Sequence, residues 1–328
     1  MSTNCYLHSL CSHVPTNILT NEDLSKIVDT NDKWIVERTG IKERHKLPDN
    51  EETSDLGYYA AKKALDNANI HANELTHIIV ATCTPDQISP SVACILAGKL
   101  DAGPVMAFDF SAACSGFIYG LNICQGIIAT NNSAKILLVC TEAMTRRLNW
   151  EDRSTCILFG DAACACILSA NEKDSLAKVE DVICQCDGKQ NDLIVVGGGT
   201  SCRYKVGSQI DERFFLSMQG RETYKHAVRQ MTNSCKTILN KNNLLIENID
   251  LFIPHQANLR IIEAVGSRLK IDEKYVFTNV AKYGNTSAAS IPLALEEALK
   301  ENRIPNNGRI LITAFGAGLT WGSGLLHF

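Results

Sequence analysis

One of the fourteen cysteines in this sequence stands in a setting that favours chemistry. Cys114 comes after a β-prone run that ends at Phe110, and a segment with helical character begins at or near it. Free N–H groups and the dipole at the start of a helix stabilise a thiolate, so we predict a thiol pKa lowered from about 8.5 toward neutrality. Packing as a small apolar residue is the alternative, and we expect it of most other cysteines. The neighbours of Cys114 are small and leave room for a substrate: Ala112, Ala113, Ser115 and Gly116.

Two uncharged polar side chains are candidates in the second half of the chain. His255 follows a strand pattern at 250–253, and the carboxyl ends of strands in open α/β sheets commonly carry functional groups. An imidazole near a helix N-terminus stays neutral and can donate a hydrogen bond. A histidine that only supports its loop is an equal alternative. Asn285 precedes a helical pattern at 287–302, where its alternative role is to cap the helix.

A glycine-rich turn at 315–318 is the last chemical candidate. Its backbone N–H groups can point at a developing oxyanion, although a β-hairpin alone also explains the glycines. Cysteine, histidine and asparagine in this order fit a papain-like hydrolase or carbon–carbon bond formation through an acyl-cysteine. The hydrolase predicts a secreted chain with an aromatic residue beside the nucleophile. Ser115 and Gly116 follow Cys114 instead, which favours the second class.

Short β-branched runs alternate with amphipathic helices along the chain, and this pattern predicts an α/β fold. The clearest strands are at 77–81, 135–140, 250–253 and 309–313, and the clearest helices are at 55–69 and 221–240. The apolar stretch at 105–128 is interrupted by polar residues, so we expect a buried strand and helix there and no membrane span. On the helix at 221–240 we assign one apolar face to the core: Tyr224, Ala227, Val228, Met231, Cys235, Ile238 and Leu239.

The two halves of the chain follow one plan. Each has an amphipathic helix, a polar turn and a strand, then a tight loop into a helix of small residues, and finally a strand with a glycine-bearing hairpin. Cys114 lies in the first of these loops and Asn285 in the second. We therefore predict a duplicated α/β core, with one half at 1–171 that carries the nucleophile and one at 172–328 that carries the His/Asn pair.

Composition narrows the functional classes further. The net charge of −4 offers no global attraction to nucleic acid. No secretory signal is visible at 1–5, which predicts a cytoplasmic protein in a reducing compartment. The sequence has no Cys-x-x-Cys pair, so we expect neither a metal site nor structural disulfides.

Several motifs together make the sequence recognisable. It resembles β-ketoacyl-acyl-carrier-protein synthase III, within the thiolase-like superfamily, along essentially the whole chain. The resemblance implies a five-layer αβαβα sandwich of two duplicated α/β halves, a homodimer and no cofactor. The motifs that carry it are at 30–45, 108–120, 159–162, 254–260, 283–287 and 315–322.

The resemblance implies a reaction as well as a fold. Cys114 is acylated by an acyl-CoA, acetyl-CoA or another short chain, and the N–H groups of Cys114 and Ala317 bind the oxyanion. His255 and Asn285 hold the thioester carbonyl of malonyl-acyl carrier protein and stabilise the enolate that forms as carbon dioxide leaves. That carbanion attacks the acyl-cysteine and gives the 3-oxoacyl-carrier-protein that initiates fatty acid biosynthesis.

The resemblance also implies binding residues. Trp34 and Arg153 sandwich the CoA adenine, which suits an indole and a guanidinium. From the residue alone, Trp34 would be interpreted as a core or interface aromatic, and the basic residues named below as a solvated helix face. Further CoA contacts are implied for Thr30, Arg38 and Gly220. Docking of the carrier protein is implied for Lys225, Arg260 and Arg268, and contact with the acyl chain for Ser89 and Phe315.

Single residues separate this chain from related families. Asn285 stands where chain-elongating synthases have a second histidine, and the turn at 315–318 lacks the second cysteine of degradative thiolases. Ala317 replaces a common glycine but keeps its N–H donor. Ser89 replaces a bulky residue, so we expect a pocket that accepts more than acetyl. An acyltransferase that moves an acyl group from Cys114 to a small acceptor in secondary metabolism is the alternative, and a non-catalytic acyl-CoA-binding module is a third.

Overall fold

Strands from both ends of the sequence pair into one continuous sheet in the computed structural model, which describes residues 4–197 and 211–328. The strand order within these residues is β11-β12-β13-β8-β1-β7-β6-β4-β5. The strands are β1 (Tyr6–His13), β4 (His77–Ala81), β5 (Met106–Phe110), β6 (Lys135–Glu142), β7 (Ala162–Ser169), β8 (Ala177–Cys186), β11 (Leu251–Pro254), β12 (Arg309–Gly316) and β13 (Thr320–His327). Two short ribbons pair β2 (Ile18–Thr20) with β3 (Glu43–His45), and β9 (Ile194–Val196) with β10 (Leu216–Met218).

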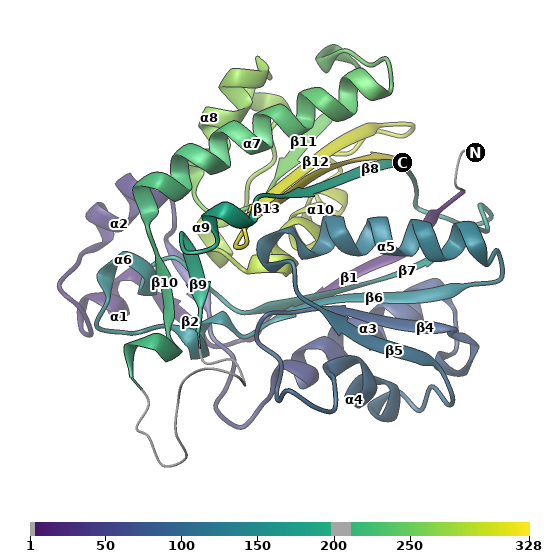
Figure 1. The fold of residues 1–328 in the computed structure, drawn as a ribbon, viewed down its shortest axis with the longest axis horizontal. Helices are drawn as coiled ribbons and strands as arrows, with labels where there is room; N and C mark the ends of the chain where they lie inside the picture. The colour runs from purple at the N-terminus through teal and green to yellow at the C-terminus, as the bar shows by residue number, and fades with distance from the viewer. Residues whose placement is uncertain (1–3, 198–210) are drawn as a thin grey trace.

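The sheet has two portions, β1-β7-β6-β4-β5 and β8-β13-β12-β11. Helices cover the outer face of each portion, and two further helices lie between the portions (Figure 1). α3 and α4 pack on β1, β7, β6, β4 and β5, while α7 packs on β8, β13 and β12 with α8 beside it. α5 and α10 lie between these two portions and contact strands of both. The predicted five-layer αβαβα sandwich is confirmed. The helices are α1 (Asn21–Ser25), α2 (Asp32–Thr39), α3 (Thr53–Ala68), α4 (Val92–Lys99), α5 (Gly116–Thr130), α6 (Arg153–Cys156), α7 (Gly220–Lys241), α8 (Leu259–Leu269), α9 (Val280–Tyr283) and α10 (Ser290–Lys300).

The two portions of the sheet meet at β1 and β8. Their pairing is short, with Tyr6 opposite Lys178 and Leu7 opposite Ala177. Each portion combines parallel and antiparallel pairs, as in β4 with β6 and β6 with β7. The predicted division after residue 171 falls in the connection from β7 to β8 and stays a prediction.

α5 is apolar on most of its surface because it packs between the two portions. Seven of its residues are buried, and it contacts β4 and β6 on one side and β8 and β13 on the other. The stretch Ala113–Thr130 has the length and hydropathy of a membrane span, but this position makes it a core helix. The predicted strand and helix at 105–128 are confirmed as β5 and α5.

The core face predicted for α7 is confirmed at six positions and wrong at one. Ala227, Val228, Met231, Cys235, Ile238 and Leu239 are buried, whereas Tyr224 is 40% exposed. Tyr224 lies in the first turns of α7, where the same face borders a cavity. The helical period alone does not show where the underlying sheet ends.

Most cysteines pack as small apolar side chains, as predicted. All thirteen that the structure describes are free thiols, and eight of them are buried. Burial raises the pKa of the Cys5 thiol and of the Cys235 thiol to about 12. These thiols are inert at neutral pH. Cys202 lies outside the described residues.

Candidate active site

A cavity of about 900 Å³ opens between the two portions of the molecule. Cys114, from the turn before α5, lines it together with His255, from the end of β11, and Asn285, from the turn before α10. The three predicted catalytic residues therefore meet at one cavity although they lie far apart in the sequence. Ala317 and Phe315, from the end of β12, line it as well.

The backbone of Cys114 is pressed against the glycine-rich turn. A Cβ atom on Gly316 would lie 2.7 Å from the Cys114 nitrogen, so only glycine fits there. Ala113 has a positive φ of 47°, which turns the chain sharply from β5 into α5. Cys114 and Ala317, which follows Gly316, both line the cavity.

The prediction of a lowered pKa for Cys114 is wrong. Burial raises the pKa of this thiol to about 12, and the charge of Glu142 adds to the rise. Hydrogen bonds from Ser287 and Asn285 favour the thiolate but do not offset burial. Desolvation of a charged sulfur therefore outweighs the start of the helix in the direction of this shift.

Two close backbone approaches fix the position of Asn285. Gly284 has φ 63°, and a Cβ atom there would lie 2.8 Å from the carbonyl oxygen of Leu158. The Asn285 N–H donates to that carbonyl at 2.8 Å, and the Gly160 N–H donates to the Asn285 carbonyl at 3.1 Å. The side-chain Oδ1 accepts the Ser287 N–H at 2.9 Å. Asn285 is thus left with its NH₂ group as the donor for a substrate.

His255 is a neutral ring with a defined partner. The backbone N–H of His255 donates to the Thr313 carbonyl at 2.8 Å, and this bond ties the residue to β12. Burial lowers the pKa of His255 to about 3, in agreement with the neutral donor expected from the sequence. The ring Nδ1 lies 2.5 Å from Ser290 Oγ, and Ser290 Oγ lies 3.5 Å from the Gln256 backbone nitrogen. If Ser290 accepts from Gln256 and donates to Nδ1, the ring proton sits on Nε2.

The aromatic residue expected at the CoA adenine lies at the mouth of the cavity. Trp34, on α2, lines the cavity with Arg38, whose guanidinium carbon is 4.3 Å from the centre of the indole. The Arg153 guanidinium lies 4.6 Å from the same ring and donates to the Asp29 carbonyl at 2.7 Å. An adenine stacked between two groups needs about 7 Å, so Arg153 must move away from Trp34 to admit one.

The other two expected CoA residues are placed less centrally. Gly220 begins α7 and lines the cavity, and a Cβ atom on it would meet no neighbour within 4 Å. Thr30 precedes α2, and its hydroxyl is buried with no hydrogen-bond partner among the described residues. It does not line the cavity.

The three residues expected to dock a carrier protein lie on α7 and α8, which pack together. Lys225 and Arg260 line the mouth of the main cavity. Arg268 lines a smaller cavity of about 330 Å³ next to it, with Lys225 and Arg229. Lys225 is paired with Glu222 at 2.7 Å, so the positive surface is partly neutralised.

The two residues expected at the acyl chain are not placed together. Phe315 is buried and lines the cavity. Ser89 is exposed in the loop after β4 and does not line the cavity of this chain. Ile88 beside it is 72% exposed. Apolar lining of the cavity comes instead from a cluster of Cys83, Met144, Phe159 and Leu216.

Three residues at the site escaped prediction from the sequence. Ser290 contacts His255, Ser287 contacts Cys114, and Glu142 contacts Ser287. The two serines look like ordinary residues at the start of a helix. Glu142 ends the apolar strand β6, and a carboxyl group at that end of a buried strand is the signal that was available.

This chain is similar to known proteins along its whole length. Residues 108–188 match the profile of 3-oxoacyl-[acyl-carrier-protein] synthase III, and residues 239–328 match the profile of its C-terminal part. The β-ketoacyl-[acyl-carrier-protein] synthase III of Oleidesulfovibrio alaskensis is 51% identical, with both chains covered completely. That of Aliarcobacter butzleri is 45% identical over 98% of this chain and 96% of its own.

Solved structures extend the similarity to three dimensions. The 3-oxoacyl-[acyl-carrier-protein] synthase III of Aquifex aeolicus superposes with a TM-score of 0.90 at 42% identity, covering 99% of this chain and 100% of the other. The priming β-ketosynthase of the R1128 polyketide pathway superposes with a TM-score of 0.91 at 29% identity, covering 100% and 97%.

Proposed function

Since this chain belongs to the β-ketoacyl-[acyl-carrier-protein] synthase III family, we propose that Cys114, His255 and Asn285 carry out its reaction. That reaction is the condensation of an acyl-CoA with malonyl-acyl carrier protein, which initiates fatty acid synthesis. The observation that supports the assignment is the convergence of a thiol and two neutral donors on one cavity. The enzyme is an acyltransferase of the condensing type.

The first half of the reaction loads Cys114. The thiol loses its proton as the sulfur attacks the thioester carbonyl of the acyl-CoA, and CoA leaves as a thiolate. The negative charge that develops on the carbonyl oxygen needs donors, and we assign the N–H groups of Cys114 and Ala317 to it. Both residues line the end of the cavity where Gly316 lies against Cys114.

The second half forms the carbon–carbon bond. We assign His255 Nε2 and the Asn285 NH₂ group to the thioester oxygen of the malonyl group. Loss of carbon dioxide leaves an enolate. Two uncharged donors stabilise its oxygen by hydrogen bonds and do not transfer a proton to its carbon. The carbanion then attacks the acyl-cysteine and releases the 3-oxoacyl product. A histidine with a pKa of about 3 stays neutral throughout the physiological range and suits this role.

We propose that both thioester substrates enter through the mouth of this cavity. We assign the CoA nucleotide to Trp34, Arg38 and Arg153 at the mouth, and Thr30 and Gly220 to its flanks. The acidic carrier protein is assigned to Lys225, Arg260 and Arg268. These steps use acyl-CoA as a substrate and require no cofactor. We further propose a homodimer in the cytoplasm.

An intact-mass experiment tests this function. Purified protein is mixed with a panel of short straight and branched acyl-CoAs, and malonyl-acyl carrier protein is then added. We expect one acyl group per chain, its loss on Cys114→Ala, and then carbon dioxide and a 3-oxoacyl product. Acylation without carbon dioxide would indicate transfer to a small acceptor, and CoA binding without acylation would indicate a binding module. Either outcome contradicts the proposal.

A further inference from the structure

A fully buried carboxyl group lies behind Cys114 and takes no part in the steps above. Glu142 is the last residue of β6 and is 0% exposed. Burial raises the pKa of this carboxyl group, and the interactions that oppose the rise come from hydrogen-bond donors: Thr84, Cys83 and Ser287. A buried acid held by donors alone is costly, so its position calls for a reason.

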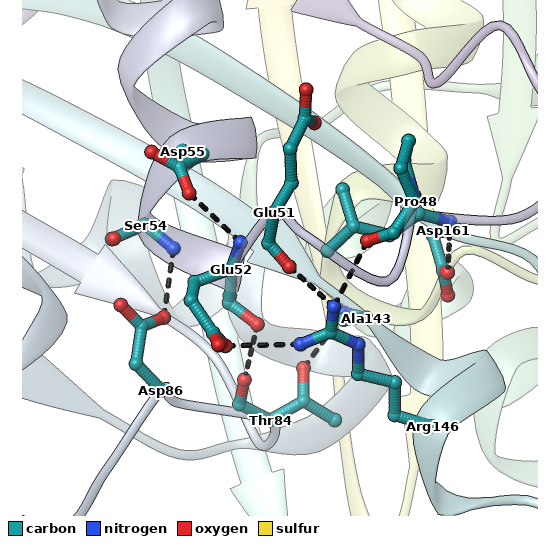
Figure 2. Close-up of polar contacts among 12 residues, drawn as sticks. Pro48, Glu51, Glu52, Ser54, Asp55, Thr84, Asp86, Ala143, Arg146 and Asp161 are labelled. Atoms are coloured by element: carbon teal, nitrogen blue, oxygen red, sulfur yellow. Dashed lines mark hydrogen bonds and ion pairs between the residues drawn. The ribbon is translucent and has the colours of Figure 1, made fainter.

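One oxygen of Glu142 is held by the loop after β4. Glu142 Oε2 accepts the Thr84 hydroxyl at 2.8 Å, the Cys83 backbone N–H at 3.1 Å and the Thr82 hydroxyl at 3.3 Å. Thr84 is itself fixed, because its hydroxyl accepts the Ala143 N–H at 2.9 Å (Figure 2). These bonds saturate Oε2 and orient the carboxyl group.

The same loop is anchored to the start of α3. The Ser54 N–H donates to Asp86 of this loop at 2.8 Å, and Arg146, in the segment after β6, pairs with Glu52 at 2.9 Å (Figure 2). The orientation of Glu142 is therefore set mainly by the loop after β4, of which Cys83 also lines the cavity.

The other oxygen of Glu142 faces the reactive thiol. Glu142 Oε1 accepts the Ser287 hydroxyl at 3.0 Å, and Ser287 Oγ lies 3.6 Å from Cys114 Sγ. Ser287 is held in place by a positive φ of 50° and by its N–H bond to Asn285. A continuous path thus leads from the thiol through a hydroxyl group to a carboxylate.

The charge of Glu142 has the wrong sign for a group that only activates a thiol. A negative charge near Cys114 raises the pKa of the thiol, whereas a cation would lower it. The Cys83 sulfur lies 3.3 Å from Oε1, and burial and the charge of Glu142 raise the pKa of this thiol as well. In its charged form, which the donors on Oε2 favour, the carboxyl group at this position disfavours a resting thiolate and can accept the thiol proton.

We propose that Glu142 takes up the proton of Cys114 during acylation, with Ser287 as the bridge, and returns it after condensation. This inference rests on the proposed function of Cys114. In acylation the sulfur–carbon bond forms as the S–H bond breaks, Ser287 receives the thiol proton, and its own proton passes to Glu142 Oε1. The CoA thiolate leaves and is protonated by solvent.

The condensation half returns the system to its starting state. The malonyl carboxylate leaves as carbon dioxide, and its electron pair forms the new carbon–carbon bond at the acyl carbon. When the tetrahedral intermediate collapses, the carbon–sulfur bond breaks and Cys114 leaves as a thiolate. The proton on Glu142 moves back through Ser287 to this sulfur. The negative charge lost with carbon dioxide reappears on Glu142, so charge and protons balance.

A purely structural role for Glu142 makes different predictions. If it only anchors the loop after β4, its loss changes folding and the shape of the cavity by a factor that does not depend on pH. If it holds the thiol proton, its loss makes acylation depend on hydroxide. The titratable groups that face Glu142 from neighbouring elements are the thiols of Cys83, Cys114 and Cys140, and burial raises the pKa of each. None of them titrates between pH 7 and pH 9.

Single-turnover acylation of Cys114 by acetyl-CoA, followed by intact mass from pH 7 to pH 9, tests the proposal. The wild type should react at a nearly constant rate. Glu142→Gln should react about 100-fold more slowly at pH 7, and its rate should rise about tenfold per pH unit. Ser287→Ala retains Glu142 but lacks the bridge, so it should show the same slow, pH-dependent acylation. It replaces the Glu142→Gln variant in the test if that variant does not fold. Thr82→Val is the control: it removes one donor to Oε2 and the acceptor of the Thr84 N–H but leaves the path through Ser287 intact, so any change in its rate should not depend on pH.

The double variant adds a second criterion. Because both residues serve one path, Glu142→Gln with Ser287→Ala should be about as slow as the slower single variant. Wild-type rates in both single variants, a loss without pH dependence, or losses that multiply would overturn the proposal. Failure of the wild type to acylate with any acyl-CoA would instead overturn the function proposed for Cys114.

Discussion

At the scale of single residues, the proposed division of labour depends on which atoms of Asn285 are free. Its Oδ1 is occupied by the Ser287 N–H, so only the NH₂ group is available to a substrate. Asn285 also donates toward the Cys114 sulfur, but that bond is minor beside burial in setting the state of the thiol. Decarboxylation should therefore depend on Asn285 more strongly than acylation does.

Asn285→Ala tests this dependence. We expect the release of carbon dioxide from malonyl-acyl carrier protein to fall about 100-fold or more, as for the loss of one oxyanion donor. Acylation of Cys114 should remain detectable by mass. Equal losses in the two half-reactions would contradict the role assigned to Asn285.

Asp161 offers a pH test at the same scale. It is buried just before β7, where it accepts the Leu47 N–H at 2.8 Å and the Thr145 hydroxyl at 2.6 Å (Figure 2 shows Asp161). Burial raises its pKa to about 6, above the value of about 3.9 in an unfolded chain. Between these values the folded state binds more protons, so stability falls as pH rises through this window.

The comparison of wild type with Asp161→Asn isolates this contribution, because asparagine does not titrate. The variant should be less stable at each pH, since an amide cannot accept all of the bonds that the carboxyl group accepts. The stability advantage of the wild type should shrink by about 1 kcal/mol from pH 5 to pH 7. Urea denaturation at both pH values measures it, and an advantage that grows with pH would show the opposite pKa shift.

The residue scale also shows where inference from the sequence failed. The start of a helix at Cys114 is visible in the sequence, but the depth at which the sulfur is buried is not. Burial depends on β12 and on the turn before α10, which come from the other end of the chain. Glu142 and Ser287 were missed for the same reason, because only tertiary contacts make them neighbours of Cys114.

At the scale of elements, short contacts between loops decide the geometry of the site. The loop at 158–160 and the turn at 283–285 exchange backbone hydrogen bonds, and each approach leaves no space for a side chain. A Cβ atom on Gly160 would lie 2.4 Å from the Tyr283 carbonyl oxygen. Glycine at these positions is a requirement of packing, and Asn285 follows directly.

Gly284→Ala should disturb both the fold and the reaction. Its φ of 63° and ψ of −157° belong to a region that is essentially limited to glycine, and we expect a cost of about 1–3 kcal/mol. Decarboxylation should fall further than acylation because Asn285 moves. Thermal unfolding and the two half-reactions measure these effects.

Gly98→Ala is the matched control for this substitution. Gly98 lies in α4, is exposed, and has no atom within 4 Å of an added Cβ. We expect unchanged activity and slightly higher stability, because alanine favours a helix. A loss of stability at Gly98 as large as that at Gly284 would show that the backbone argument is wrong.

Elements with a clear period were predictable from the sequence. The strand at 77–81 matches β4, and the helix at 221–240 falls within α7. The strand at 309–313 runs on to Gly316 as β12, because its last residues pack beneath Cys114. The exposed Tyr224 shows the limit of this reasoning, since a period identifies a face and not what covers it.

At the scale of the whole molecule, the chain combines a negative net charge with a local basic surface. The chain carries a net charge of −4, which repels an acidic partner at long range. Lys225, Arg260 and Arg268 gather on α7 and α8 beside the cavity that holds Cys114. An acidic carrier protein should therefore be oriented by this local surface, and the attraction should weaken with salt because exposed charges are screened.

Arg268→Glu separates carrier docking from chemistry, because Arg268 lines the smaller cavity and does not line the one that holds Cys114. Reversal of this charge should raise the KM for malonyl-acyl carrier protein about tenfold and leave the rate of Cys114 acylation by acetyl-CoA within about twofold. Raising the ionic strength should raise the wild-type KM for the carrier more than that of the variant, since the variant has already lost part of the attraction. Steady-state kinetics at two salt concentrations measure both effects. An equal change in the two substrates would mean that α8 shapes the cavity itself, and the docking surface would then have to lie elsewhere.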